Sequence, residues 1–257
     1  MKRISLLMLI VIVAAALAAA ALATSAGPGI SPDEALRLLK EGNARYVDGK
    51  LQHPRQGPER RALTSGQGQH PLAAVLTCSD SRVPPEIIFD QGIGDLFVVR
   101  VGGNVAATDE IGSIEYAVDQ RGAPLVLVLG HTQCGVVGAV LDGAKLPPNI
   151  ASLAEPIKPA VDKAREANLG AAQDVLLKAA ITGNVWQAMD DMLRLSPVIR
   201  EKVKEGKVKL VGALYDLDSG QVQWLGPHPD QEKLVGAKKG PAGKSGKKGK
   251  KPKKSEE

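Results

Sequence analysis

The sequence is poor in aromatic residues and in cysteine. Phe, Trp and Tyr together make up 3% of the 257 residues, so the core must be aliphatic and stacking platforms for nucleic-acid bases are not expected. We therefore expect no specific nucleic-acid partner. The two cysteines do not form a Cys-x-x-Cys unit, which many redox motifs and structural zinc sites use. A chain of this length buries a sizeable core and needs neither a disulfide nor a metal merely to fold.

Positive charge is concentrated at the two ends of the chain. The formal net charge is +5, but Lys2 and Arg3 lie near the start and nine lysines lie between residues 238 and 254. Without the +2 of the start and the net +7 of this end, the body carries about −4. We expect residues 233–257 to be a disordered lysine-rich tail. It is either a solvated extension, which we favour, or a contact to an anionic surface.

Residues 1–23 have the pattern of a secretory signal peptide. A basic start precedes the apolar run 4–20, which contains no charged residue, and Ala21-Leu22-Ala23 is a small-x-small cleavage site. An uncleaved membrane anchor is the alternative, which the abundance of alanine disfavours. We expect residues 24–30 to be a short linker and the protein to be exported, either periplasmic or secreted. In such an oxidising compartment two free cysteines would pair or oxidise unless a metal held them.

Residues 31–232 alternate between apolar strands and helical segments, which predicts one α/β domain. A capped helix from Ser31 to about Tyr46 forms an N-terminal helical arm, and residues 51–69 are expected to be irregular. The fold class expected is a central, mostly parallel sheet of four strands plus an antiparallel edge strand, flanked by helices. The strands are expected at residues 72–76, 95–101, 125–129, 207–215 and 221–225, with helical stretches at 84–90, 108–121, 136–141, 147–180 and 185–203.

Two stretches with metal-binding side chains directly follow predicted strands. Cys78 and Asp80 follow the strand at 72–76, whereas His131 and Cys134 follow the strand at 125–129. If these strands are adjacent and parallel, their carboxyl ends bring all four side chains to one point. Taken alone, the histidine is more simply a satisfied core or surface residue, and each cysteine a small buried hydrophobe. Together, two thiolates, an imidazole and an oxygen suit a mononuclear tetrahedral zinc site.

The same stretches resemble the β-class carbonic anhydrases. The matching motifs are Cys78-Ser79-Asp80-Ser81-Arg82-Val83-Pro84-Pro85-Glu86, Gly94-Asp95-Leu96-Phe97-Val98-Val99-Arg100, Gly102-Gly103-Asn104-Val105, Ser113-Ile114-Glu115-Tyr116-Ala117, Gly130-His131-Thr132-Gln133-Cys134-Gly135-Val136 and Tyr215-Asp216-Leu217. The resemblance covers about residues 31–227 in family order. It implies one Zn²⁺ per subunit on Cys78, His131 and Cys134, with Asp80 and Arg82 as the catalytic pair. The implied reaction is reversible hydration of carbon dioxide to bicarbonate and a proton by zinc-bound hydroxide, which that pair orients.

The resemblance carries three further expectations. In some members of the family the aspartate leaves its arginine and becomes the fourth zinc ligand in a closed, inactive state, and Asp80 is suited to either arrangement. Gly102 and Gly103 are candidates for the substrate pocket, although an ordinary tight turn explains them equally well. The N-terminal helix resembles an arm laid across a partner subunit, so a homodimer or a dimer of dimers is expected.

Three other functions remain open for such a site. A non-catalytic zinc-binding protein of the same fold would need the metal ligands but neither Asp80 nor Arg82. A related hydrolase would act on another small electrophile, such as carbon disulfide. A thiol redox protein would use Cys78 and Cys134 directly, although the chain lacks a Cys-x-x-Cys unit.

Overall fold

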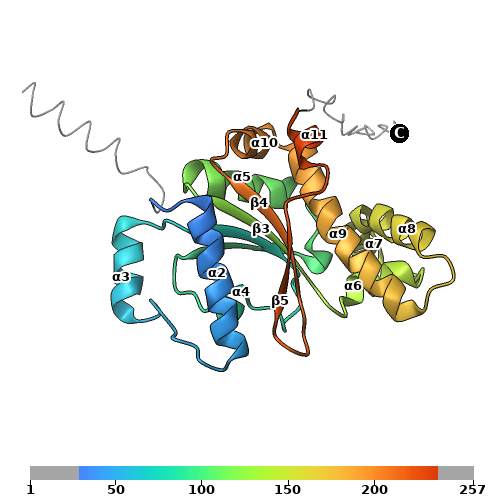
Figure 1. The fold of residues 1–257 in the computed structure, drawn as a ribbon, viewed down its shortest axis with the longest axis horizontal. Helices are drawn as coiled ribbons and strands as arrows, with labels where there is room; N and C mark the ends of the chain where they lie inside the picture. The colour runs from blue at the N-terminus through green and yellow to red at the C-terminus, as the bar shows by residue number, and fades with distance from the viewer. Residues whose placement is uncertain (1–28, 237–257) are drawn as a thin grey trace, which may run out of the picture.

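The computed structural model describes residues 29–236, which form one α/β sandwich around a five-stranded sheet (Figure 1). The expected signal peptide at residues 1–23 and most of the expected tail lie outside the described residues. Within residues 29–236, no helix combines the length and apolarity needed to cross a bilayer.

The sheet has the strand order β2-β1-β3-β4-β5, with four parallel strands and one antiparallel edge strand. The strands are β1 (Ala73–Thr77), β2 (Leu96–Arg100), β3 (Leu125–His131), β4 (Lys209–Tyr215) and β5 (Val222–Gly226). The predicted fold class is therefore confirmed. β1 and β3 are buried along their whole length, as expected for central parallel strands covered on both faces.

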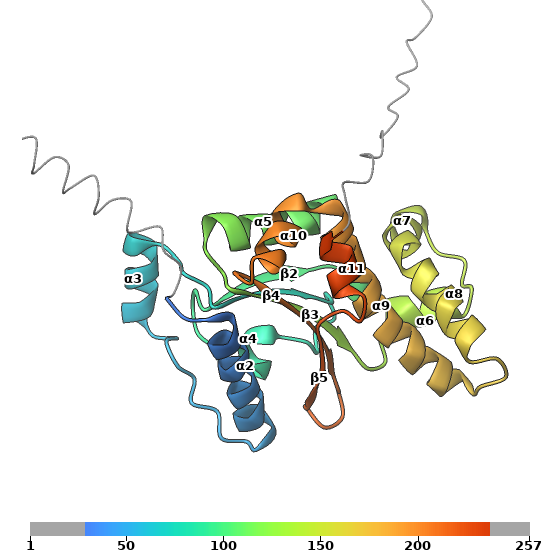
Figure 2. The same ribbon diagram turned by 45° about the horizontal axis from the view of Figure 1, so that its top comes forward.

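Helices cover both faces of the sheet (Figures 1 and 2). They are α2 (Pro32–Val47), α3 (Pro58–Gln67), α4 (Pro85–Ile88), α5 (Thr108–Gln120), α6 (Gly135–Leu141), α7 (Pro148–Ala154), α8 (Lys158–Ala167), α9 (Gln173–Leu195), α10 (Pro197–Lys204) and α11 (Gln231–Gly236), with 3₁₀ turns η1 (Gly102–Asn104) and η2 (Glu155–Ile157). Residues of α2 and α4 form the core on one face, and residues of α5, α9 and α10 form the larger core on the other.

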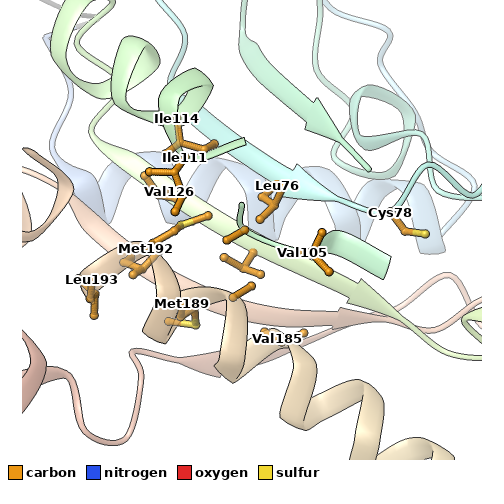
Figure 3. Close-up of a cluster of buried hydrophobic side chains, with 14 of the residues drawn as sticks. Leu76, Cys78, Val105, Ile111, Ile114, Val126, Val185, Met189, Met192 and Leu193 are labelled. Carbon is orange, nitrogen blue, oxygen red and sulfur yellow. The ribbon is translucent and has the colours of Figure 1, made fainter. Parts of the chain in front are cut away.

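Alternation along the strands assigns each side chain to one of these two cores. Leu76 and Val128 point into the larger core, whereas Val75 and Leu127 point into the smaller one. Figure 3 shows part of the larger core, in which Leu76 and Cys78 lie on the same side of β1. Cys78 is thus the polar end of a row of core side chains, and its position follows from the strand that precedes it.

The helical regions differ from expectation at four places. The connection at 51–69 contains α3, which begins at Pro58 with Glu59 in its first turn, a start that suits a helix. α9 is continuous where two stretches were expected: it contains no proline, and Gly183, at the expected break, remains helical and lies close to Ala160 of α8. The break falls instead at the turn before Gln173, and a second break before Pro197 separates α9 from α10. α11 crosses the expected boundary between body and tail, with Leu234 buried in the core.

Glycine substitutions should show how closely α2 packs on α4. A Cβ atom at Gly42 would lie 1.8 Å from the carbonyl oxygen of Phe89, whereas a Cβ at the exposed Gly112 of α5 would meet nothing within 4 Å. We expect Gly42→Ala to lower the free energy of unfolding by about 1–3 kcal/mol. Gly112→Ala should raise it by about 0.5–1 kcal/mol, because glycine weakens a helix interior. Urea unfolding of both variants measures this, and similar values for the two would contradict the packing described.

Candidate metal centre

The candidate site lies where the sheet changes its winding direction. From β1 the chain passes to β2 on one side, and then returns to place β3 on the other side. In open α/β sheets the crevice at the carboxyl ends of two such strands is the usual place for ligands. Cys78 directly follows β1, His131 is the last residue of β3, and Cys134 is the N-cap of α6.

The structure brings the three expected metal ligands together. One ligand atom from each of Cys78, His131 and Cys134 lies within 4.8 Å of the other two, and all three residues are buried. The two cysteines do not form a disulfide. Cys78 and His131 are 53 positions apart in the sequence and nevertheless converge, as the positions of the strands predict.

His131 is oriented as a metal ligand would be. Its Nδ1 lies 2.8 Å from the carbonyl oxygen of Thr132, which as an acceptor requires the proton on Nδ1. Its Nε2 is then left with a lone pair, and this buried atom has no hydrogen-bond partner. A buried polar atom without a partner is unfavourable unless something else satisfies it. The donor set of one imidazole and two thiols fits Zn²⁺, with one coordination position left over.

The two thiols differ in their surroundings. The contact with Cys134, supported by the N–H of Gly103, lowers the pKa of Cys78 to about 4. The same contact with Cys78, together with burial, raises the pKa of Cys134. One thiolate therefore forms readily, and a second negative charge beside it needs a positive partner, which a divalent cation supplies.

Asp80 and Arg82 form a bidentate ion pair beside these ligands. Arg82 Nε donates to Asp80 Oδ1 at 2.9 Å and its terminal nitrogen donates to Oδ2 at 2.7 Å. The Arg82 guanidinium holds the pKa of the Asp80 carboxyl well below its usual range. Asp80 Oδ2 lies 4.0 Å from His131 Nε2, so the carboxylate faces the metal ligands without joining their cluster.

The expected substrate-pocket residues Gly102 and Gly103 lie in the tight turn η1. The N–H of Gly103 donates to Cys78 Sγ at 3.3 Å, so this residue contacts a metal-ligand candidate. The two interpretations of these glycines are therefore compatible, because the same tight turn also contacts a candidate metal ligand.

Sequence reasoning missed two residues that shape the site. Arg100, the last residue of β2, donates to the carbonyl oxygens of Cys78 at 3.1 Å and Asp80 at 2.6 Å, and so holds the first loop. Its place at the end of the strand next to β1 was the available signal. Gln133 has a φ of 57°, a left-handed conformation that lets the chain turn between His131 and Cys134. A glutamine gives no sequence signal for that conformation.

Comparison with known proteins finds relatives along most of the chain. A family model described as carbonic anhydrase matches residues 73–222. Carbonic anhydrase 2 of Mycobacterium tuberculosis is 39% identical over 198 residues, covering 76% of this chain and 93% of that protein. The carbonic anhydrase of Mycolicibacterium smegmatis is 39% identical over 200 residues, covering 76% and 94%.

Solved structures agree with these sequence relatives. The β-carbonic anhydrase CafA of Aspergillus fumigatus superposes with a TM-score of 0.62 at 26% identity, over 79% of this chain and 94% of that one. A tetrameric β-carbonic anhydrase of Sordaria macrospora gives a TM-score of 0.60 at 25% identity, over 72% and 94%.

Metal removal should change the reactivity of the cysteines. A coordinated thiolate is not a free nucleophile, so both thiols should be protected from 5,5′-dithiobis(2-nitrobenzoate) in the metal-loaded protein. After chelation and desalting, we expect two thiols per chain to react, matching the two free cysteines. Protein reloaded with Zn²⁺ is the control. Equal reaction rates with and without metal would contradict a shared metal on these sulfurs.

Proposed function

The chain belongs to the β-class carbonic anhydrases, and from this premise we propose that it hydrates carbon dioxide reversibly with one Zn²⁺ held by Cys78, His131 and Cys134. The observation that carries the proposal is the buried cluster of these three ligand residues, together with the unpartnered Nε2 of His131. When bound, the metal supplies the chemistry that makes water a nucleophile near neutral pH.

Asp80 is proposed to orient the attacking water. A carboxylate only accepts hydrogen bonds, so it fixes the direction of the water's O–H and turns a lone pair of that water toward the substrate. Oδ1 already accepts from the backbone and side chain of Arg82, whereas Oδ2 accepts from Arg82 once. The free acceptor position is thus on Oδ2, the oxygen that faces His131 at 4.0 Å.

Arg82 is proposed to hold Asp80 in this orientation and keep it ionised. Two parallel N–H···O bonds fix the plane of the carboxylate, which a single contact would not do. The closed state, in which Asp80 would become a metal ligand, requires both bonds to break. Half of the Arg82 side chain is exposed, at 52%, so water can replace the lost partner and the switch remains accessible.

A homo-oligomer is proposed on two grounds. A hollow between α2 and α3 is lined partly by the apolar side chains of Ile30, Leu38, Leu63 and Leu72, and Leu63 is 43% exposed. An apolar surface of this kind is typical of an interaction site. The Sordaria macrospora relative is described as tetrameric. Whether the assembly is a homodimer or a dimer of dimers would be measured by light scattering.

Export is proposed from the sequence of residues 1–23, and cell fractionation with N-terminal sequencing tests it. The lysine-rich end is proposed to be dispensable for the reaction, because its charge lies outside the domain that carries the site.

Replacement of Asp80 should separate catalysis from metal binding. In Asp80→Asn the amide can donate as well as accept, so the water is no longer oriented uniquely. We expect kcat/KM for hydration to fall by about 10²–10⁴-fold in stopped-flow assays while zinc content stays at one per chain. Asp162→Asn, at an exposed position of α8, is the matched control. Unchanged turnover in Asp80→Asn would contradict the proposal that Asp80 orients the water. Loss of zinc from this variant would show that Asp80 is itself a metal ligand.

The pH profile should reveal the role of Arg82. With Arg82 present, the pKa of Asp80 is lowered and the carboxylate stays ionised as pH falls; in Arg82→Leu this effect disappears and burial raises the pKa. In this variant the Asp80 carboxyl should therefore take up a proton at a pH near or above the usual aspartate pKa of about 3.9. We expect the ratio of variant to wild-type kcat/KM to stay constant from pH 8 to about pH 6 and to fall as the pH is lowered further toward about 4. A ratio that is independent of pH would contradict this role.

A further inference from the structure

Asn184 is a polar side chain in an apolar part of the core. It lies on α9, and 1% of its surface is exposed. Its neighbours along the helix, Ala180, Ile181 and Val185, are all buried in the larger core. Burying an amide among such side chains is unfavourable unless it forms hydrogen bonds. Its Nδ2 donates to the carbonyl oxygen of Gly103 at 2.6 Å, across 81 positions of the sequence.

Gly103 connects this amide to the metal centre. Its own N–H donates to Cys78 Sγ at 3.3 Å, while its carbonyl oxygen accepts from Asn184. Gly103 has a φ of 76°, in the left-handed region that favours glycine. A Cβ here would lie 2.6 Å from Cδ1 of Ile157, so a residue with a side chain would have a strained backbone and would displace the end of Ile157.

A turn built from two glycines needs support from outside itself. Gly102 and Gly103 have no side chains to restrict the backbone, which is therefore free to adopt many conformations. Within the turn, the N–H of Asn104 donates to the carbonyl oxygen of Val101 at 3.1 Å. The bond from Asn184 adds a fixed point on a 23-residue helix that packs against β3 and β4.

We propose that Asn184 is a positioning residue of the metal centre, which holds the Gly103 backbone so that its N–H stays on the sulfur of Cys78. The inference rests on the proposed function, since it requires a metal on that sulfur. An N–H···S bond stabilises the negative charge of a coordinated thiolate, so it should slow the release of the metal. Residues that orient metal ligands typically change metal affinity or activity by about 10–100-fold when removed.

Two variants and one control test this role by zinc release. Asn184→Leu removes the donor at similar volume, and Asn184→Ala removes it and leaves space. Met192→Ala, in the same helix and fully buried, removes packing far from Gly103 and shows what loss of stability alone does. In the zinc-loaded proteins, we expect release to excess chelator to be at least about tenfold faster for both Asn184 variants. Met192→Ala should lower the melting temperature with release within about threefold of wild type.

A second measurement uses the wild-type protein and does not depend on a variant that folds. In protein loaded with ¹¹³Cd, the Gly103 amide proton should show scalar coupling to the metal through the N–H···S bond. Absence of that coupling overturns the proposal, as does release from both Asn184 variants at the rate of Met192→Ala. If wild-type protein instead binds no zinc, the proposed function itself fails, and the zinc content of the wild type distinguishes the two failures.

Discussion

The register between β1 and β3 is the constraint on which the site depends. Thr77 pairs with Leu129, and the Thr77 hydroxyl donates to the Leu129 carbonyl oxygen at 2.9 Å, which fixes this register near the site. The next residues along the two strands are then Cys78 and Gly130, one position from His131. A slip of one residue would exchange the faces of the side chains and separate the sulfur from the imidazole. Apolar burial on both faces of the two strands opposes such a slip, so the packing of the core sets the geometry of the metal ligands.

Sequence patterns predicted the parts of this arrangement that are local or repeat along a strand. The apolar runs before Cys78 and His131 indicated buried parallel strands, and the two motifs at their ends indicated a shared site. These predictions succeeded because the position of a side chain just after a strand follows from the strand itself. The antiparallel β5 was predicted from another local pattern, because two apolar runs separated by only a few residues favour a hairpin.

What the sequence did not reveal depends on contacts between distant segments. α3 is rich in polar residues, and none of its residues is buried. Its position is set by Arg60, which donates to the Ile93 carbonyl oxygen at 2.7 Å and contacts Asp95. Asn184 falls between two of the expected helical stretches with no motif around it, and only the fold brings its amide to Gly103. Periodicity cannot identify such residues, because their partners lie dozens of positions away and follow no repeat.

The site combines fixed and movable parts, and this division follows from burial. Cys78, His131 and Cys134 are at most 4% exposed and lie at the ends of packed elements, so their ligand atoms have little freedom. Asp80 and Arg82 lie on the loop beyond β1, where the arginine side chain is 52% exposed, and only hydrogen bonds to each other hold their carboxylate and guanidinium together. A change at Arg82 therefore disturbs the orientation of Asp80 without removing packing from the core. The same chain can hold a metal tightly and still move the carboxylate beside it, because the strands hold the ligands and one ion pair holds Asp80.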